Sequence, residues 1–256
     1  MKRWPYPRLF AHRGGGKLAP ENTLAAIRLG ASLGYRAAEF DVKLTRDGVA
    51  LLLHDATLER TTNGKGDAGS CDWAALAELD AGSWHSEAFR GEPLARFDAT
   101  AKLLKSLGML ANVEIKPSPG REEETGALVA ALAAEFWKGA AVAPLLSSFS
   151  YVALEAAQRM APELPRAWLT DEMKPEDWLA IERLESVSLN TNHKKLVRED
   201  IGRLHDLGVR VLVYTVNEIA RAEELFAWGV DGMFTDNLDE FARRFPDALA
   251  PGRTGK

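Results

Sequence analysis

The stretch 209–218, Val-Arg-Val-Leu-Val-Tyr-Thr-Val-Asn-Glu, decides the fold of this 256-residue chain. Its first part, Val209–Tyr214, is a short apolar run rich in valine, which is typical of a buried strand. A polar loop follows, and Asn217-Glu218 then places a capping residue at the start of a helical stretch. The stretch therefore predicts one strand–loop–helix unit.

Eight such units occur along the chain, and glycines stand where several helices are expected to end, at Gly34, Gly108, Gly208 and Gly229. The predicted strands are Leu9–Ala11, Ala37–Val42, Leu110–Ile115, Val142–Leu146, Arg166–Leu169, Ser186–Leu189, Val209–Tyr214 and Gly232–Phe234. The helical stretches begin near Asn22, Asp98, Arg121, Ser150, Pro175, Val197, Glu218 and Leu238. Eight units predict a (β/α)8 TIM barrel. A doubly wound open sheet is the alternative, but it gives no reason for eight units.

Two segments interrupt this pattern after the second strand. Leu44–Gly48 followed by Val49–Leu53 is typical of a hairpin that turns at residues 45–48. Residues 56–95 carry scattered glycine, tryptophan and polar residues without a clear period, and we interpret them as an insertion. Barrel active sites lie at the carboxyl ends of the strands, so we expect the insertion to form part of the pocket wall. We predict a single domain over residues 1–256.

The composition excludes several classes of partner. The chain has 32 Lys+Arg against 37 Asp+Glu, and this net charge of −5 gives no general attraction to nucleic acid or anionic membranes. The longest charge-free run, Gly139–Leu154, is too short and too polar to cross a bilayer. Cys71 is the single cysteine, which excludes an internal disulfide. No apolar core follows Arg3, so we expect no signal peptide and a cytoplasmic location; the oligomeric state stays open.

Charged residues inside two predicted strands indicate a functional site, because a barrel interior has no water to solvate them. Glu39 and Asp41 lie two apart and share the inner face of the second strand, and Glu114 and Lys116 repeat this arrangement on the third. Three converging carboxylates repel one another unless a cation neutralises them, and oxygen ligands favour Mg²⁺ or Ca²⁺ over zinc. The alternative is a salt-bridged rim in which Glu39 pairs with Arg36 and Glu114 with Lys116.

Two histidines are expected at the same end of the barrel. His12 ends the first strand and leads, through Arg13 and a glycine run, into the first helix, a suitable place for an anion. His54 ends the return strand of the hairpin, and a turn centred between Asp47 and Gly48 places it opposite Asp41. A slip of one residue in this register would turn His54 away.

The acids, the histidines and the two cations together suit metal-assisted phosphoryl chemistry. Cations neutralise a phosphodiester, and two imidazoles that titrate near neutrality can take and give protons. A metal-dependent lyase or an enolase-like barrel would share the carboxylates but would not need two histidines and Arg13 beside the metal. His205 lies in a helix among charged neighbours and is expected to be solvated. His193 lies in a loop that could reach the pocket, although a surface role is favoured, and His85 in the insertion has no assigned role.

The same residues resemble the glycerophosphodiester phosphodiesterases, a family of barrels of the phospholipase-C-like type. The resemblance covers nearly the whole chain in order, and the segment Trp4–Asn22 is most similar to the cytoplasmic bacterial branch associated with glycerol-phosphate uptake. The matching motifs are Ala11-His12-Arg13-Gly14, Pro20-Glu21-Asn22-Thr23, Glu39-Phe40-Asp41-Val42, Asp47-Gly48, Leu53-His54-Asp55, 58–64, Glu114-Ile115-Lys116, Ser147-Ser148-Phe149, Tyr214-Thr215-Val216-Asn217 and Gly229-Val230-Asp231-Gly232.

The resemblance implies hydrolysis of glycerophosphodiesters to sn-glycerol 3-phosphate and an alcohol. It implies that one divalent cation, with Mg²⁺ preferred to Ca²⁺, is held by Glu39, Asp41 and Glu114. His54 would be the proton donor and His12 the acceptor. The substrate-binding residues would be Arg13 and Lys116 at the phosphate and Tyr214, which stands where many members have Trp. The alternatives are a lysophospholipase D-like phosphodiesterase and a non-catalytic protein that binds glycerophosphodiesters.

Overall fold

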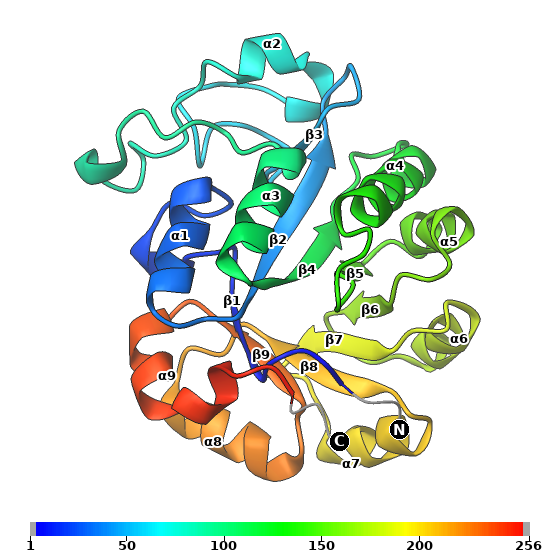
Figure 1. Ribbon diagram of the computed structural model, residues 1–256. Helices are drawn as coiled ribbons and strands as arrows, with labels where there is room; N and C mark the ends of the chain where they lie inside the picture. Colours follow the sequence, from blue (N-terminus) through cyan, green and yellow to red (C-terminus); the bar gives the residue numbers. More distant parts are fainter. Residues whose placement is uncertain (1–3, 253–256) are drawn as a thin grey trace.

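A closed barrel of parallel strands forms the centre of the molecule, with helices outside it (Figure 1). The computed structural model describes residues 4–252. The parallel strands are β1 (Leu9–Ala11), β2 (Ala37–Leu44), β4 (Leu110–Ile115), β5 (Leu145–Ser148), β6 (Arg166–Thr170), β7 (Ser188–Asn192), β8 (Arg210–Tyr214) and β9 (Gly232–Thr235). β1 pairs with both β9 and β2, and this double pairing closes the ring. The predicted (β/α)8 barrel is confirmed and the open sheet is wrong.

The helices begin within two residues of the predicted positions. They are α1 (Leu24–Ser32), α3 (Phe97–Leu107), α4 (Glu122–Phe136), α5 (Tyr151–Met160), α6 (Pro175–Arg183), α7 (Arg198–Asp206), α8 (Ile219–Trp228) and α9 (Leu238–Arg244), besides the short α2 (Trp73–Leu76) and the 3-10 turns η1 (Gly16–Leu18), η2 (Ala68–Ser70), η3 (Glu87–Phe89) and η4 (Pro246–Leu249). Gly108 and Gly229 end α3 and α8 in the left-handed conformation, at φ of 64° and 100°. In the described part of the chain, every helix is too short or too polar to cross a membrane.

Two strands are shifted toward their carboxyl ends at both their starts and their ends, relative to their apolar runs. β5 spans Leu145–Ser148 where Val142–Leu146 was predicted, and β7 spans Ser188–Asn192 where Ser186–Leu189 was predicted. An apolar run is a poor guide here, because the barrel interior is polar at this end and the last strand residues are serine, asparagine and threonine.

The interior of the barrel is apolar toward the amino ends of the strands. A buried cluster there contains Tyr6, Phe10, Leu212 and Phe234, and the rings of Phe10 and Phe234 lie 5.1 Å apart. Outward-facing residues such as Phe40 belong instead to the large core between the strands and the helices. The interior therefore changes from apolar to charged along the strands, which leaves the carboxyl end for chemistry.

The predicted hairpin is confirmed, but its register differs by one residue. β3 (Ala50–Leu52) runs antiparallel to β2, with Val42 opposite Leu52 and Leu44 opposite Ala50. The turn is thus centred on Asp47 itself, and Leu53, not His54, donates a backbone hydrogen bond to Asp41 at 3.1 Å. The prediction that His54 pairs with Asp41 in the ladder was wrong.

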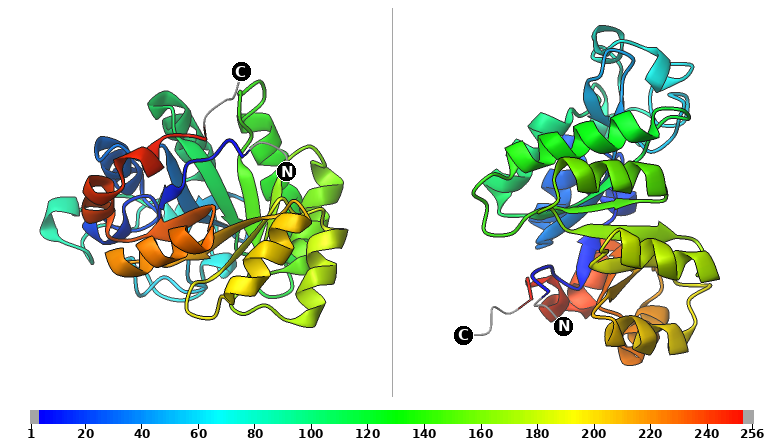
Figure 2. Two further views of the ribbon diagram at one scale, coloured as in Figure 1. Left: turned by 90° about the horizontal axis from the view of Figure 1, so that it is seen from below. Right: turned by 90° about the vertical axis from the view of Figure 1, so that its right-hand side faces the viewer.

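The segment 56–95 extends away from the barrel beyond β3 (Figures 1 and 2). It is held by a small apolar cluster of its own, separate from the main core, which contains Leu51, Leu53, Leu58, Ala68, Leu76, Ala81 and Leu94. Leu51 and Leu53 come from the return arm of the hairpin, so β3 anchors the insertion on the barrel.

Candidate active site

A cavity of about 140 Å³ opens at the carboxyl end of the barrel. Its wall contains all eight residues that the sequence singled out for a site, which come from β1, β2, the β3 end, β4 and β8. The lining residues are His12, Arg13, Glu39, Asp41, His54, Asn112, Glu114, Lys116, Ser147, Phe149, Leu169, Asn190, Tyr214, Thr215 and Phe234. The lining contains no residue of 56–95, so the expectation that the insertion forms part of this wall was wrong.

Three buried carboxylates lie together on one side of the cavity. Glu39, Asp41 and Glu114 each offer an oxygen, and these oxygens all lie within 4.8 Å of one another. Burial and the charge of Asp41 raise the pKa of Glu39 to about 8 and that of Glu114 to about 7. Three hard oxygen donors whose mutual repulsion disfavours ionisation fit a divalent cation.

Two cations flank the carboxylates. Lys116 Nζ lies 2.6 Å from Glu114 Oε1 and 3.4 Å from Asp41 Oδ1. Arg13 Nε lies 3.7 Å from Asp41 Oδ2, and although this atom is buried it has no hydrogen-bond partner within residues 4–252. Burial opposes the ionisation of Asp41, but Lys116 and Arg13 outweigh it and lower the pKa of Asp41. Of the two pairs in the salt-bridged rim, only Glu114–Lys116 forms among the described residues, since Glu39 accepts from the Arg13 backbone at 3.0 Å.

Asn22 fixes Asp41, a role that sequence reasoning missed. The Asn22 amide donates to Asp41 Oδ2 at 2.8 Å, and its oxygen accepts from the Asp41 backbone N–H at 3.1 Å. The helix cap is the next residue, Thr23, whose hydroxyl accepts from Ala26 N at 3.1 Å. Asn22 therefore holds the acid, and its neighbour caps the helix.

His12 is oriented by a carboxylate from the last strand. Its Nδ1 lies 2.6 Å from Asp236 Oδ1, and its Nε2 lies 3.8 Å from Glu39 Oε2. Burial lowers the pKa of His12, but the Asp236 hydrogen bond and the Glu39 charge outweigh it, and the net shift is upward. Asp236 is held by Asn217, whose amide donates to it at 3.0 Å and whose oxygen accepts from its backbone at 2.8 Å. Asn217 was predicted to cap α8; that prediction was wrong, because its side chain is used at Asp236.

His54 is oriented by a second carboxylate, Asp55, at 2.7 Å from its Nδ1. It reaches the cavity in spite of the shifted register because β3 ends at Leu52 and the chain has left the ladder. Burial lowers the pKa of His54, and Arg13 lowers it further against the charge of Asp41.

The insertion supports His54 from behind through one arginine. Arg60 Nε donates to Asp55 Oδ2 at 2.6 Å, and Arg60 Nη1 donates to Glu21 Oε2 at 2.7 Å. Glu21 also accepts from Arg13 Nη1 at 2.7 Å, so one chain of ion pairs joins the insertion to the first loop of the barrel. Sequence reasoning gave no role to Asp55 or Asp236, although the first follows His54 directly and the second follows the last strand.

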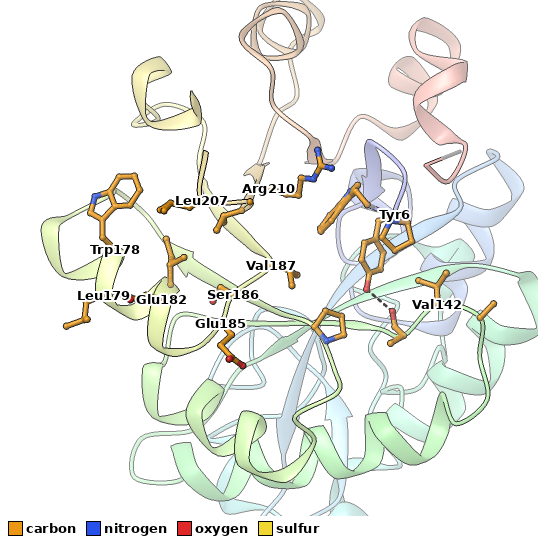
Figure 3. Close-up of a pocket in the computed structure, with 18 of the residues that line it drawn as sticks. Tyr6, Val142, Trp178, Leu179, Glu182, Glu185, Ser186, Val187, Leu207 and Arg210 are labelled. Atoms are coloured by element: carbon orange, nitrogen blue, oxygen red, sulfur yellow. Dashed lines mark hydrogen bonds between the residues drawn. The ribbon is translucent and has the colours of Figure 1, made fainter. Parts of the chain in front are cut away.

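A second, larger groove of about 1030 Å³ lies near the amino ends of the strands (Figure 3). Tyr6 and Val187 lie in its middle and Trp178 at one side, and most of its wall is apolar. Among the described residues, the one cluster suited to a metal ion lies in the small cavity and not here. The small cavity is therefore the candidate active site.

The sequence model of the glycerophosphoryl diester phosphodiesterase family matches residues 12–240. The chain belongs to this family. A glycerophosphodiester phosphodiesterase of Caldanaerobacter subterraneus subsp. tengcongensis is 33% identical over 233 residues, which cover 90% of this chain and 93% of that protein. An Oleispira antarctica phosphodiesterase, solved with the product sn-glycerol-3-phosphate, is 31% identical with a TM-score of 0.89 over 94% of this chain and 97% of that chain.

A third member of the family resembles the whole barrel in the same way. The glycerophosphodiester phosphodiesterase of Agrobacterium tumefaciens strain C58 is 29% identical with a TM-score of 0.78, over 93% of this chain and 99% of that chain. The family likeness thus covers the barrel and the insertion together, and it makes the chain an enzyme of the phosphoric diester hydrolase class.

Proposed function

We propose that this cavity hydrolyses glycerophosphodiesters to sn-glycerol 3-phosphate and an alcohol, with one divalent cation. The observation that carries the proposal is the convergence of Glu39, Asp41 and Glu114 between two carboxylate-oriented histidines. The product complex of the Oleispira relative supports the choice of substrate.

The cation would be held by the three carboxylates, and we assign Mg²⁺ rather than Ca²⁺. When bound, it supplies positive charge that polarises a phosphoryl oxygen. Mg²⁺ is bound by few carboxylates together with substrate phosphate and water, whereas Ca²⁺ takes six to eight oxygens. Three carboxylates on one side of an open cavity match the first pattern better.

Arg13 and Lys116 would bind the phosphate. Both lie beside the carboxylates, and the buried Arg13 Nε has a hydrogen to donate and no acceptor among the described residues. Tyr214 lies across the cavity, where its hydroxyl donates to Thr170 O at 3.1 Å and its ring meets Phe149 edge-on at 6.0 Å. These two rings would contact the carbon chain of the substrate.

The two histidines would move the protons, each through the nitrogen that its carboxylate leaves free. Nδ1 of His12 is bonded to Asp236 and Nδ1 of His54 to Asp55, so Nε2 is the exchanging atom in both. As the family resemblance implies, His54 would be the donor to the leaving alcohol and His12 the base.

The test is the release of sn-glycerol 3-phosphate from choline, ethanolamine and glycerol esters, with and without chelator. We expect loss of activity on chelation and recovery with Mg²⁺. Glu114→Gln removes one ligand charge and should lower the affinity for the metal, while Glu135→Gln, an exposed acid on α4, is the matched control. Full activity of the chelated enzyme contradicts the proposal, and activity on lysophospholipids alone would favour the lysophospholipase D-like alternative.

We also propose that residues 1–256 form a single domain, that the protein is cytoplasmic, and that it belongs to the branch associated with glycerol-phosphate uptake. Cell fractionation tests the location, and a single cooperative unfolding transition tests the domain.

A further inference from the structure

Three neutral polar side chains line the cavity beside the carboxylates. Asn112 on β4 is in register with Glu39 and lies two residues before Glu114 on the same face, Ser147 on β5 is in register with Glu114, and Asn190 lies on β7. All three line the cavity, and their exposed fractions are 1%, 0% and 0%. These residues, called the floor here, have no part in the chemistry proposed above.

Hydrogen bonds within the floor run from Asn190 through Asn112 to Ser147. Asn190 Nδ2 donates to Asn112 Oδ1 at 3.3 Å, and Asn112 Nδ2 donates to Ser147 Oγ at 2.8 Å. Behind the floor, Ser188 Oγ donates to Asn190 Oδ1 at 3.3 Å. Each of the two amide oxygens therefore already accepts one hydrogen bond.

Three donor hydrogens are left over. A primary amide carries two N–H groups and a hydroxyl carries one O–H group. Asn112 and Asn190 each use one N–H, and Ser147 accepts without donating, so two N–H groups and one O–H find no acceptor among residues 4–252. Buried donors without partners are costly, which indicates that the cavity normally holds a group with oxygen acceptors.

The place of the floor selects the kind of group. Phosphate is expected at Arg13 and Lys116, whose side chains are 19% and 23% exposed, whereas the floor is buried. Leu169 and Phe234 add apolar lining to the same cavity, so a molecule that extends inward from the phosphate can meet both carbon contacts and hydrogen-bond donors. A short carbon chain with free hydroxyl groups has this pattern, and neither a purely apolar alcohol nor a second anion beside three carboxylates has it.

We propose that Asn112, Ser147 and Asn190 form a subsite for the free hydroxyl groups of the glycerol half of the substrate. The inference rests on the proposed function, and it makes the floor the part of the enzyme that distinguishes a glycerol phosphate from a simple alkyl phosphate. Its donors bind hydroxyl oxygens, and a ligand without hydroxyls leaves them unpaired.

The experiment compares the binding of sn-glycerol 3-phosphate and n-propyl phosphate, which has the same carbon chain without hydroxyls, by calorimetry of the Mg²⁺-loaded enzyme. We expect the wild type to prefer the hydroxylated ligand on the order of tenfold to a hundredfold. Ser147→Ala and Asn190→Ala should bring this ratio close to one and leave the affinity for propyl phosphate unchanged. Ser147→Ala removes a single hydroxyl and is the safer variant for folding.

The matched control is Ser148→Ala, the next residue on the same strand. Ser148 is equally buried, but its hydroxyl donates to Ile115 O at 2.7 Å and it does not line the cavity, so its loss should leave the ratio unchanged. A wild-type ratio in both floor variants, or no preference in the wild type, overturns the inference and makes the floor a site for water. If the wild type neither binds nor cleaves any glycerophosphodiester, the proposed function itself fails.

Discussion

The two ends of the barrel are built from the same strands but are opposite in character. At the carboxyl end a cavity of about 140 Å³ holds three buried carboxylates, two histidines and two cations. At the amino end the interior is filled by rings such as Phe10 and Phe234, and the larger groove of about 1030 Å³ outside them is mostly apolar. The comparison teaches that the volume of a cavity does not identify the active site. Buried charged residues at the carboxyl ends of the strands identify it, while the amino end stabilises the barrel.

The largest effect is expected at the carboxyl end, from the two histidines. Removal of either should reduce kcat/KM on a natural ester by about 10²–10⁴, because alkoxide is a poor leaving group and the nucleophile needs a base. On a nitrophenyl ester, whose alcohol leaves without a proton, His54→Ala should recover most of its lost rate and His12→Ala should stay impaired.

The measurement is a two-by-two comparison of kcat/KM for the two variants and the two esters, with metal content checked in each. Rescue of His12→Ala alone would show that the roles are reversed. Rescue of neither variant would show that proton transfer by at least one of these histidines is not the main contribution.

The amino end should respond to mutation in stability and not in chemistry. Phe10→Ala removes a fully buried ring from the interior cluster and should cost about 3–5 kcal/mol in the free energy of unfolding. Phe149→Ala, at the carboxyl end with 46% of its residue exposed, is the matched control and should cost much less. Urea unfolding of both variants measures the difference, and equal costs would contradict the division between the two ends.

Asp236→Asn tests whether orientation of His12 matters at the carboxyl end. A carboxylate accepts from both His12 and Asn217, but an amide has a single acceptor oxygen and would present its NH2 group to one of them. With the oxygen toward Asn217, the imidazole loses its preferred tautomer, and in either orientation it loses its charge partner. We expect kcat/KM to fall about 10²-fold with little change in thermal stability. Asp239→Asn, a half-buried acid on α9 that pairs with Arg243, is the control. Unchanged activity of Asp236→Asn would mean that Glu39 and the strand end suffice to hold His12.

The affinity for the cation should rise with pH. Without metal, Glu39 and Glu114 have pKa values of about 8 and about 7, above the ordinary 4.5, so the folded protein holds protons there that the unfolded chain has lost. The stability that these groups contribute is thus present below about pH 4.5 and is lost as the pH rises through 7 to 8. Metal binding must displace these protons. For each proton displaced, the metal affinity should therefore rise by up to about tenfold per pH unit until the pH passes 7 to 8. Calorimetry between pH 6 and 9 measures this slope, and a flat profile contradicts the raised pKa values.

The smallest effect is expected at the rim of the amino-end groove. Leu207 is 66% exposed there, and Leu207→Ser should change the free energy of unfolding by less than about 0.5 kcal/mol and leave kcat/KM unaltered. A clear change in kcat/KM would show that the two ends of the barrel are coupled.

The sequence by itself determined the repeated strand–helix units and which residues belong to the site. Periodicity, capping residues and glycines are local signals, so eight strands, eight helix starts and the shared inner face of Glu39 and Asp41 could be predicted without coordinates. His12, Arg13 and Lys116 could be placed at the same end because parallel strands all end there, and the family resemblance added Tyr214. His54 was placed there from a hairpin register that is off by one residue, and the cavity nevertheless contains all five.

Only the tertiary structure decided which groups these residues meet. Asp236 reaches His12 across 224 residues of chain because β9 pairs with β1 when the ring closes. The side chains of Asn22 and Asn217 can either cap a helix or bind a carboxylate. In the folded chain Asn22 binds Asp41 and Asn217 binds Asp236, because these carboxylates lie within hydrogen-bond distance. The hairpin register likewise depended on the geometry of its turn. Hydrogen-bonding groups choose among partners by distance, and distances between remote segments exist only once the chain has folded.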